Sequence, residues 1–359
     1  MFIEPQASAA ASPARVHGGI IASELRALSI STNEVLDFSV NTNPYGPCQA
    51  IVAAIRNAPI DTYPDSAASH AREALAQNQN VSMDRILIGN GASDLLWTIA
   101  RALVSPGDSV LIAEPTFSEF RAAAVMARAR IAEYRADQES DFKLDLATLG
   151  GVLTRTSASM LYLCSPNSPT GTFVSAQDTA AFAADHPNVT FVLDESFLSL
   201  SDRFADAFVP MKANVIRVRS LTKDFAIPGL RVGYLIASVE LIARLEANRP
   251  AWATSSAVQA AVIASAQEYE FLARSRAAII ADRNFLSAAL CEIGMPPVPG
   301  VAPFLLIAVA SAAALRTRLL RQRILVRDCA SFGLPHHIRV AVRPQTDAAI
   351  LISALKQER

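Results

Sequence analysis

A lysine set among hydroxyl residues is the candidate nucleophile of this chain. Lys223 follows Ser220 and Thr222, and Arg231 comes eight positions after the lysine. The apolar, β-branched segment at 214–219 predicts a strand that ends just before it, where open α/β sheets bind ligands. A lysine there can form an imine with an aldehyde, and the hydroxyls and guanidinium suit a phosphate. The segment therefore fits an aldehyde that carries a phosphate, although on its own it fits a solvated surface loop equally well.

A second segment predicts a cradle for that phosphate. Residues 86–96, ILIGNGASDLL, indicate a short strand, a Gly-Asn-Gly turn and the start of a helix. The backbone N–H groups of Ala92 and Ser93, with the positive end of the helix dipole, can bind a phosphate. Asp94 stands where a dinucleotide fingerprint has its third glycine, so the turn does not indicate dinucleotide binding.

Three further segments offer contacts for a pyridine ring. Asp194 ends the predicted strand in TFVLDES and can pair with a protonated ring nitrogen, although a helix cap or a salt-bridged core acid is the alternative. Phe117, after the strand SVLIA, can lie on the ring face or simply belong to the core. The turn SPNSPTG at 165–171 offers Asn167 and Ser168 as donors near a phenolic oxygen. Together the segments predict pyridoxal 5′-phosphate as the cofactor.

The order of these motifs carries a family resemblance. GNGASD, EPTF, SPNSPTG, LDESF, SLTK and GLRVGY resemble, over nearly the whole chain, the fold-type I, aspartate-aminotransferase-like enzymes of classes I and II. The chain is similar to the histidinol-phosphate aminotransferase group and, within it, most of all to the threonine-phosphate decarboxylases of cobalamin biosynthesis. The narrower similarity rests on VHGG at 16–19, DFSVNTNPYGP at 37–47, and RQRILVRDCA and HIRVAVR near the end. The resemblance implies an α/β fold: a large domain with a mostly parallel seven-stranded sheet and a smaller α+β C-terminal domain.

The resemblance also implies a role for each matching residue. Lys223 is the Schiff-base lysine, Asp194 the partner of the ring nitrogen, and Phe117 the stacking ring. The cofactor phosphate would be held by Ala92, Ser93, Ser220, Thr222 and Arg231, and by Tyr63 reaching from the neighbouring subunit of a homodimer. The substrate contacts would be Arg339 for a carboxylate, Arg327 for a distal phosphate, and Asn43 and His17. A structural role for His17 is equally compatible with the sequence, and Arg343 is a further possible contact or an exposed residue.

Departures from the family pattern bear on the reaction. The usual Asn before Pro-Thr-Gly is Ser168 here, with Asn167 one place earlier, so either can contact the ring's O3′. Phe197 stands where the aminotransferases have Tyr. The decarboxylases resemble this chain in having Phe at that position, which favours decarboxylation. Two positions argue against a decarboxylase. Ile20 stands where the decarboxylase pattern HGGN has Asn, and Ala92 replaces the acidic residue that usually follows the Gly-Asn-Gly turn.

Composition agrees with an enzyme of this kind. The chain has 359 residues, 51% hydrophobic and 18% charged, enough for the cores of one large and one smaller domain. The net charge of −1 indicates neither a nucleic-acid nor an acidic-surface partner. The four cysteines form no metal-binding or disulfide pattern, which favours the reducing cytoplasm, and the longest apolar stretch is too short to span a membrane. We expect no metal.

The order of predicted elements divides the chain. Residues 1–15 are expected to be a disordered tail, 16–45 an N-terminal arm that joins the small domain, 46–248 the large domain and 249–359 the small domain. Strands are expected at RILIG, SVLIA, SMLYLC, VTFVLD, NVIRVR and GYLIA, followed by a long helical region at 257–293. FLLIAVA, ILVRD and HIRVAV predict the strands of the small domain.

Three functions are compatible with these motifs. The first is decarboxylation of a phosphorylated hydroxyamino acid such as threonine phosphate. The second is transamination of histidinol phosphate or another amino acid with 2-oxoglutarate. The third is a non-enzymatic regulator that keeps the fold, which the intact set of Lys223, Asp194 and Arg231 argues against.

Overall fold

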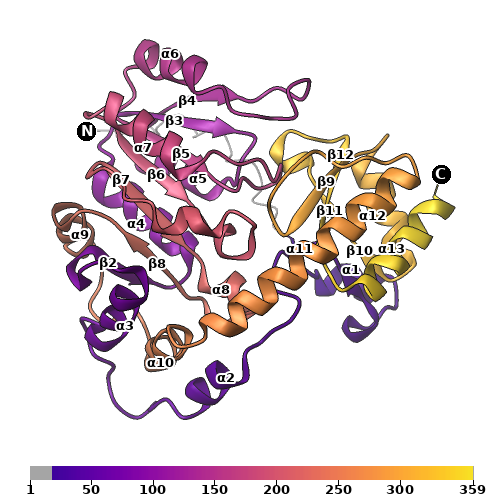
Figure 1. Ribbon diagram of the computed structural model, residues 1–359, viewed down its shortest axis with the longest axis horizontal. Helices are drawn as coiled ribbons and strands as arrows, with labels where there is room; N and C mark the ends of the chain where they lie inside the picture. Colours follow the sequence, from indigo (N-terminus) through magenta and orange to yellow (C-terminus); the bar gives the residue numbers. More distant parts are fainter. Residues whose placement is uncertain (1–17, 359) are drawn as a thin grey trace, which may run out of the picture.

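A computed structural model describes residues 18–358 of the chain, so the predicted tail and His17 lie outside the described residues. Figure 1 shows two bodies side by side, with the long helix α11 (Tyr269–Glu292) running between them. The larger body holds the main sheet, and the smaller one holds the C-terminal elements together with the N-terminal segment from residue 18.

The large body is built on a sheet of seven strands in the order β2-β8-β7-β6-β5-β3-β4. Strands β3 to β7 are parallel neighbours, and β8 is antiparallel to both β2 and β7. Their bounds are β2 Ile86–Gly89, β3 Ser109–Glu114, β4 Arg130–Arg135, β5 Met160–Cys164, β6 Thr190–Asp194, β7 Val215–Arg219 and β8 Gly233–Ile236. The predicted mostly parallel seven-stranded sheet is confirmed.

Helices cover both faces of this sheet because its inner strands are apolar on both sides. In β3, Val110 and Ile112 pack against one face, whereas Leu111 packs against the other. The first face is covered by α4 (Ala92–Leu103), α5 (Glu119–Met126) and α9 (Val239–Glu246). The second is covered by α6 (Leu146–Thr156) and α7 (Ala176–Asp185), whose N-termini are capped by Asp145 and Ser175.

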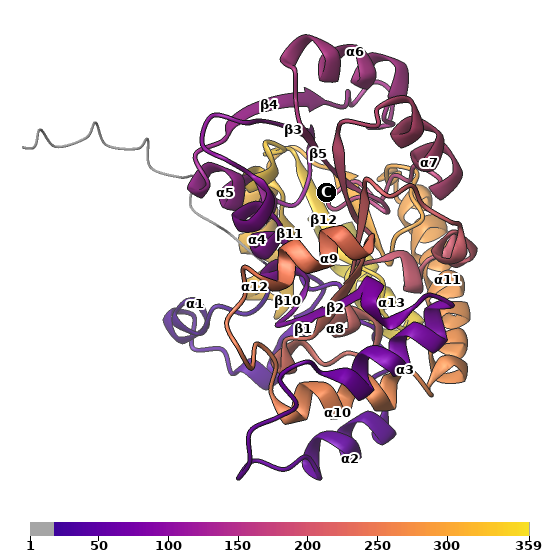
Figure 2. The same ribbon diagram turned by 90° about the vertical axis from the view of Figure 1, so that its left-hand side faces the viewer.

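A third cluster covers the β2 edge of the sheet. Helices α2 (Gln49–Arg56), α3 (Ser69–Gln79) and α10 (Ser256–Ser265) pack together there, at the lower end of the molecule in Figure 2. Because α10 contributes Val258, Ala261 and Val262 to this core, its packing favours a domain boundary later than residue 248. The division into domains remains a proposal.

The small body has two short sheets. The first is antiparallel, in the order β11 (Arg327–Asp328), β12 (His337–Ala341) and β9 (Phe304–Ala308). In the second, β1 (Leu36–Asp37) pairs in parallel with β10 (Ile324–Leu325). The helices α1 (Ala22–Ala27), α12 (Ala312–Arg321) and α13 (Gln345–Gln357) complete this body.

The structure differs from the sequence predictions at two elements. The edge strand β4 was not predicted, because its residues are half-exposed and alternate charged with apolar types instead of forming an apolar run. The long helical region is divided into α10 and α11 at 266–268. Among residues 18–358, no helix combines the length and the hydropathy needed to cross a bilayer.

Candidate functional site

A cavity of about 400 Å³ lies where the carboxyl ends of β6 and β7 meet the start of α4. Ten of the residues singled out from the sequence line it, although they come from six separate segments of the chain. They are Ala92, Ser93, Phe117, Ser168, Asp194, Ser220, Thr222, Lys223, Arg231 and Arg339. The structure therefore brings most of the predicted site together in one place.

Lys223 lies on α8 (Leu221–Asp224), the short helix that follows β7. Burial, followed by the nearby guanidinium groups of Arg339 and Arg231, lowers the pKa of this lysine from its ordinary 10.5 to about 8. An amine with this pKa is partly neutral near physiological pH, and the neutral amine is the nucleophile. The environment thus prepares Lys223 to attack an aldehyde.

Asp194 ends β6 and is only 3% exposed. Its Oδ1 accepts a hydrogen bond from the Ser196 backbone N–H at 3.0 Å, and its Oδ2 accepts one from the Tyr162 hydroxyl at 3.0 Å. Burial raises the pKa of Asp194, and these hydrogen bonds act in the opposite direction. No cation of residues 18–358 forms a salt bridge with this carboxylate, so a protonated ring nitrogen in the cavity would be its natural partner.

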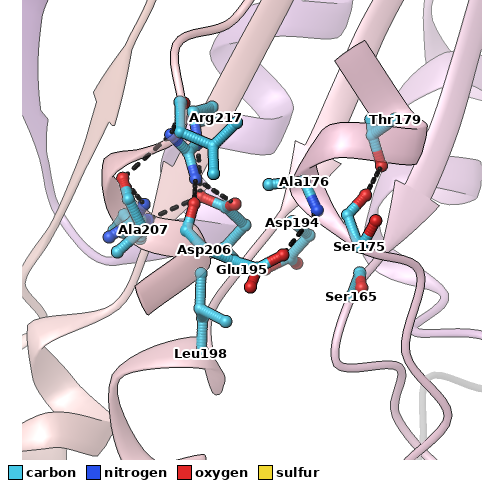
Figure 3. A network of polar contacts seen from close by, with 12 residues as sticks. Ser165, Ser175, Ala176, Thr179, Asp194, Glu195, Leu198, Asp206, Ala207 and Arg217 are labelled. Carbon is cyan, nitrogen blue, oxygen red and sulfur yellow. Dashed lines mark hydrogen bonds and ion pairs between the residues drawn. The ribbon is translucent and has the colours of Figure 1, made fainter. Parts of the chain in front are cut away.

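The next residue, Glu195, has a different environment. Its carboxylate pairs with Arg217 at 2.6 Å and with Arg219 at 2.6 Å, and all three side chains are buried. Arg217 also donates to the carbonyls of Asp206 and Ala207 on η4 (Phe204–Phe208), so its guanidinium is surrounded by acceptors. Figure 3 shows this network beside Asp194. The network adjoins the cavity, because Asp194 and Ser196, which flank Glu195 in the chain, both line it.

The opposite end of the cavity is suited to an anion. The N–H groups of Ala92 and Ser93 belong to the first turn of α4 and have no acceptor within the helix. Gly91, with φ +92°, precedes them, and a Cβ at this position would lie 2.8 Å from Nη2 of Arg231. The glycine therefore lets the guanidinium lie against the helix start. The Ser220 hydroxyl donates to Thr222 Oγ1 at 3.0 Å on the neighbouring wall.

This donor set fits pyridoxal phosphate. The anion cradle would take the phosphate, Asp194 the ring nitrogen and Lys223 the aldehyde, and all of these groups line the same cavity. Phe117 also lines the cavity and would offer its ring to the cofactor.

Arg339 forms the wall of the cavity on the small body. Its Nη1 donates to Ser168 Oγ at 2.8 Å, its Nη2 donates to the Ser39 carbonyl at 3.0 Å, and the amide oxygen of Asn41, turned toward it, lies 3.1 Å from Nε. Burial lowers the pKa of Arg339 to about 10. Within residues 18–358 no carboxylate forms a salt bridge with it, so this buried cation is suited to an anionic ligand.

Arg327 lies directly opposite Arg339 across the β11–β12 pair. It lines a second cavity of about 320 Å³, which shares Gly18 and Ser39 with the first. Its Nη2 donates to Ser331 Oγ at 2.7 Å, and burial lowers its pKa. The second cavity also contains Arg316, whose guanidinium forms a two-pronged ion pair with Glu24 at 2.6 and 2.7 Å.

Two asparagines predicted as ligand contacts lie behind the cavity wall. The Asn167 amide donates to the Pro115 carbonyl and to Thr170 Oγ1, and its oxygen accepts from Thr116 Oγ1. The Asn43 amide donates to the Asp224 carbonyl at 2.8 Å. Neither residue lines the cavity, whereas Ser168 does, so the geometry favours Ser168 over Asn167 for a contact with the ring's O3′. The predicted ligand contacts of both asparagines stay predictions.

Two other predicted residues lie elsewhere on the chain. Tyr63 is 80% exposed, and its ring stacks on Trp252 with the centroids 4.6 Å apart. Arg343 forms an ion pair with Asp347 at 2.8 Å, one turn along the same chain segment. Neither lines the cavity that contains Lys223.

Several residues that line the cavity or support its lining residues were not predicted from the sequence. Asn41 and Ser39 contact Arg339, and the Tyr162 hydroxyl supports Asp194. A signal existed for Tyr162, since a hydroxyl in an otherwise apolar strand needs a partner, and the parallel neighbour of that strand ends in Asp194. No comparable signal distinguished Asn41 from Asn43, because both lie in the same polar segment.

Comparisons with known proteins agree with this geometry. The family model described as aminotransferase class I and II matches residues 33–355. A histidinol-phosphate aminotransferase from Symbiobacterium thermophilum is 34% identical over 91% of this chain and 91% of its own length. A threonine-phosphate decarboxylase from Salmonella typhimurium is 32% identical over 95% of both chains. The crystal structure of a histidinol-phosphate aminotransferase from Sinorhizobium meliloti in complex with pyridoxal 5′-phosphate has a TM-score of 0.81 at 27% identity and covers 89% of both chains.

Proposed function

Because the chain belongs to the family of class I and II aminotransferases, we propose that it transfers an amino group between a histidinol-phosphate-like substrate and a 2-oxo acid. The chain is a pyridoxal-phosphate-dependent enzyme of fold type I, as its sequence predicted. The motifs alone favoured decarboxylation over transamination. The comparisons favour the reverse order, because several of its relatives are histidinol-phosphate aminotransferases from different organisms.

The proposed mechanism assigns a task to each group of the cavity. Bound pyridoxal phosphate supplies an electron sink for the bond that breaks at the substrate's Cα. Asp194 holds a proton at the ring nitrogen, because a buried carboxylate without a cation stabilises positive charge beside it. Arg231 and the first turn of α4 hold the phosphate.

Lys223 would have a second task, which is to move the substrate's proton. Its Nζ would accept the proton from the substrate's Cα and could release it again, because its lowered pKa of about 8 allows transfer in both directions near neutral pH. Arg339 orients the carboxylate of the oxo acid or of its amino acid product. The position in which Arg339 would hold this carboxylate would decide between loss of the Cα proton and loss of CO₂.

The observation that carries the proposed substrate class is the pairing of two arginines. Arg327 and Arg339 are directly opposite each other on adjacent antiparallel strands, where like charges repel. They line neighbouring cavities that share Ser39. A guanidinium can bind a planar or tetrahedral anion through two charged hydrogen bonds, so the arrangement suits the phosphate of the amine substrate on Arg327 and, in the other half-reaction, the carboxylate of the oxo acid on Arg339.

A specific observation keeps threonine-phosphate decarboxylation as the second candidate. Phe197 lines the cavity, and by the family resemblance it occupies the position at which the aminotransferases of this group have a tyrosine. The ring packs edge-on against Phe304, with the centroids 5.0 Å apart. The threonine-phosphate decarboxylase relative supports the same alternative.

One assay separates the two candidates. The purified enzyme, supplied with pyridoxal phosphate, is incubated with histidinol phosphate plus 2-oxoglutarate, and separately with threonine phosphate. We expect glutamate to form in the first mixture faster than CO₂ is released in the second. Arg327→Gln should lower kcat/KM for the phosphorylated substrate by about 10²-fold, because it removes a charged hydrogen-bond donor, and should spare the half-reaction with glutamate.

Lys223→Ala serves as the control for adventitious activity, since it lacks the proposed base. CO₂ release from threonine phosphate without glutamate formation in the first mixture would replace the aminotransferase proposal by the decarboxylase. Turnover of neither substrate would remove both phosphorylated compounds from the proposal.

We also propose a homodimer in which Tyr63 reaches the neighbouring subunit's cofactor phosphate. The observation in its favour is the exposure of Tyr63 and of Trp252, on which it stacks. Mixing inactive Lys223→Ala subunits with weakened Tyr63→Phe subunits should produce hybrid dimers with one site that has both native residues. A gain in activity on mixing is expected, and an active monomer in sedimentation at assay concentration would refute the dimer.

A further inference from the structure

A short segment of the chain connects the two walls of the active-site cavity. This crossing segment, residues 38–43, begins in the small body, where the Phe38 N–H donates to the Leu325 carbonyl at 2.8 Å and the Ala341 N–H donates to the Phe38 carbonyl at 2.8 Å. It ends on the large body, where the Asn43 N–H donates to the Lys223 carbonyl at 2.9 Å.

Asn43 completes the hydrogen bonds of the helix that carries Lys223. The four carbonyls of α8 are the terminal carbonyls of a very short helix, so each needs a hydrogen-bond donor from a residue beyond the helix. The Leu221 and Thr222 carbonyls accept from residues just beyond the helix. The Lys223 carbonyl accepts from the backbone N–H of Asn43, and the Asp224 carbonyl accepts from its side-chain Nδ2 at 2.8 Å.

The Asn43 side chain is held firmly in this arrangement. It is 2% exposed, and its Oδ1 accepts from the Tyr45 backbone N–H at 2.9 Å. The chain continues in close contact with the same region, since a Cβ on Gly46 would lie 2.7 Å from the Ala226 Cβ. Asn43 therefore contacts the backbone around Lys223 and does not line the ligand cavity.

The same crossing segment contacts Arg339 at its other end. The Ser39 carbonyl accepts from Arg339 Nη2 at 3.0 Å, and the Asn41 amide oxygen, turned toward the guanidinium, accepts from Nε at 3.1 Å. Only three residues separate Ser39 from Asn43. The segment thus holds Lys223 through its backbone and Arg339 through its guanidinium.

We propose that Asn43 is a positioning residue for Lys223, and that the crossing segment sets the separation of Lys223 from Arg339. The inference rests on the proposed function, because it requires Lys223 to move the proton of a substrate that Arg339 orients. Its consequence is that Asn43 acts on proton transfer without touching the substrate. Loss of its amide should therefore lower kcat more than it raises KM.

The test compares Asn43→Ala with a matched control, Asn214→Ala. The Nδ2 of Asn214 also donates to backbone carbonyls, those of Ala183, His186 and Val189 at 3.1, 3.1 and 2.8 Å, but Asn214 does not line the cavity. Both substitutions remove hydrogen bonds from a side-chain amide to the backbone, so both should lower thermal stability.

In the holoenzyme, we expect Asn43→Ala to lower kcat at least about tenfold, as misplaced catalytic groups do, with KM changed less than about threefold. It should also shift the pH midpoint of the visible absorption of the bound cofactor. Asn214→Ala should leave kcat, KM and the midpoint unchanged. Asn43→Ser, which keeps a small hydroxyl donor, is measured in parallel and replaces Asn43→Ala if that variant aggregates.

A second readout uses the cofactor-free protein. Amide hydrogen exchange of residues 221–227 should be faster in Asn43→Ala than in the wild type, because the Asp224 carbonyl at the end of α8 loses its side-chain donor while the backbone bond to the Lys223 carbonyl remains. The same peptide should exchange at the wild-type rate in Asn214→Ala. This measurement does not depend on catalysis.

Each remaining outcome overturns the inference. A raised KM with unchanged kcat and unchanged pH midpoint would make Asn43 a substrate contact. Equal changes in kcat and in the exchange of 221–227 in both variants would reduce its role to general stability. If Lys223→Ala retains turnover, the proposed function fails; if Lys223→Ala is inactive while Asn43→Ala behaves like the wild type, only the present inference fails.

Discussion

Two neighbouring carboxylates, Asp194 and Glu195, are both buried but have opposite surroundings. Glu195 has two arginine partners at 2.6 Å, whereas Asp194 has only neutral hydrogen-bond donors. A buried charge is costly unless it is paired. The protein neutralises Glu195 by itself and leaves Asp194 to a cation that arrives with the cofactor.

The cations of the two regions differ in the same way. Arg217 and Arg219, on β7, are paired with Glu195, whereas Arg339 contacts neutral acceptors at the cavity. The difference separates structural charges from functional ones. Substitutions in the paired region should affect mainly folding, and those in the cavity mainly turnover.

The largest effect is expected at Lys223. Lys223→Ala removes both the amine that binds the aldehyde and the base that moves the proton, so kcat should fall at least about 10³-fold. The measurement is single-turnover formation of the oxo acid product. Borohydride should fix the cofactor to the peptide that contains residue 223 in the wild type. Labelling of another lysine would contradict the assignment.

Asp194→Asn should have the next largest effect. The amide cannot stabilise a protonated ring nitrogen, so kcat should fall about 10²-fold, as for other preorganised electrostatic groups. The free energy of unfolding should change little, because the substitution removes a buried charge that has no cationic partner. A rate within a few-fold of the wild type would mean that another group faces the nitrogen.

Arg339→Gln tests the cationic side of the cavity. It should lower kcat/KM for glutamate by about 10²-fold through loss of a charged hydrogen-bond donor. The free energy of unfolding of the cofactor-free protein, measured with denaturant, should change by less than about 1 kcal/mol, since burial already disfavours this charge. Strong destabilisation would place Arg339 with the structural charges.

Glu195→Gln should show the reverse pattern. It leaves Arg217 and Arg219 buried without their carboxylate, which should lower the free energy of unfolding by about 3–5 kcal/mol. The kcat of the folded enzyme should stay within about threefold of the wild type, because Glu195 does not line the cavity. Measuring both quantities on one preparation keeps them separable, and a selective loss of kcat would contradict the distinction between the two regions.

The smallest effect expected is a shift in pH dependence. Capture of pyridoxal phosphate by the cofactor-free protein requires neutral Lys223, so its rate should rise with pH and reach half its maximum near pH 8 instead of near 10.5. Stopped-flow absorbance measures this rate. In Arg339→Gln the midpoint should move upward, because a nearby positive charge is lost. A midpoint near 10.5 in the wild type would contradict the effect of burial.

The same pKa has a consequence for stability. The unfolded chain binds the lysine proton more tightly than the folded protein does, so the cofactor-free protein should gain stability as pH rises from about 8 to 10.5. Below pH 8 both states carry the proton, and this contribution no longer varies with pH.

The sequence predicted those parts of the site that depend on local pattern. Asp194 and Lys223 each follow an apolar strand, and parallel strands place such residues at one edge of the sheet. The Gly-Asn-Gly turn before α4 was equally readable, because the turn and the helix start lie together in the sequence. These features need no knowledge of distant contacts.

The parts that the sequence did not reveal depend on contacts between distant segments. Asn41 faces the cavity and Asn43 faces α8, a choice made by packing against residues near 223 and 339. Ser168 faces the cavity while Asn167 braces its own turn, and two adjacent polar residues give no indication of this in the sequence. The edge strand β4 was missed because an exposed strand lacks the apolar run of a buried one.

The pairing of β1 with β10 has a consequence for synthesis of the chain. Leu36 is a neighbour of Ile324, so the small body contains some of the earliest residues described and some of the last. On the ribosome, every strand of the seven-stranded sheet emerges before β10 does. The large body can therefore fold first, while β1 has not yet paired with β10. Arg339 on β12 also emerges after every strand of the large sheet, so the cavity acquires its wall on the small body later than its wall on the large body.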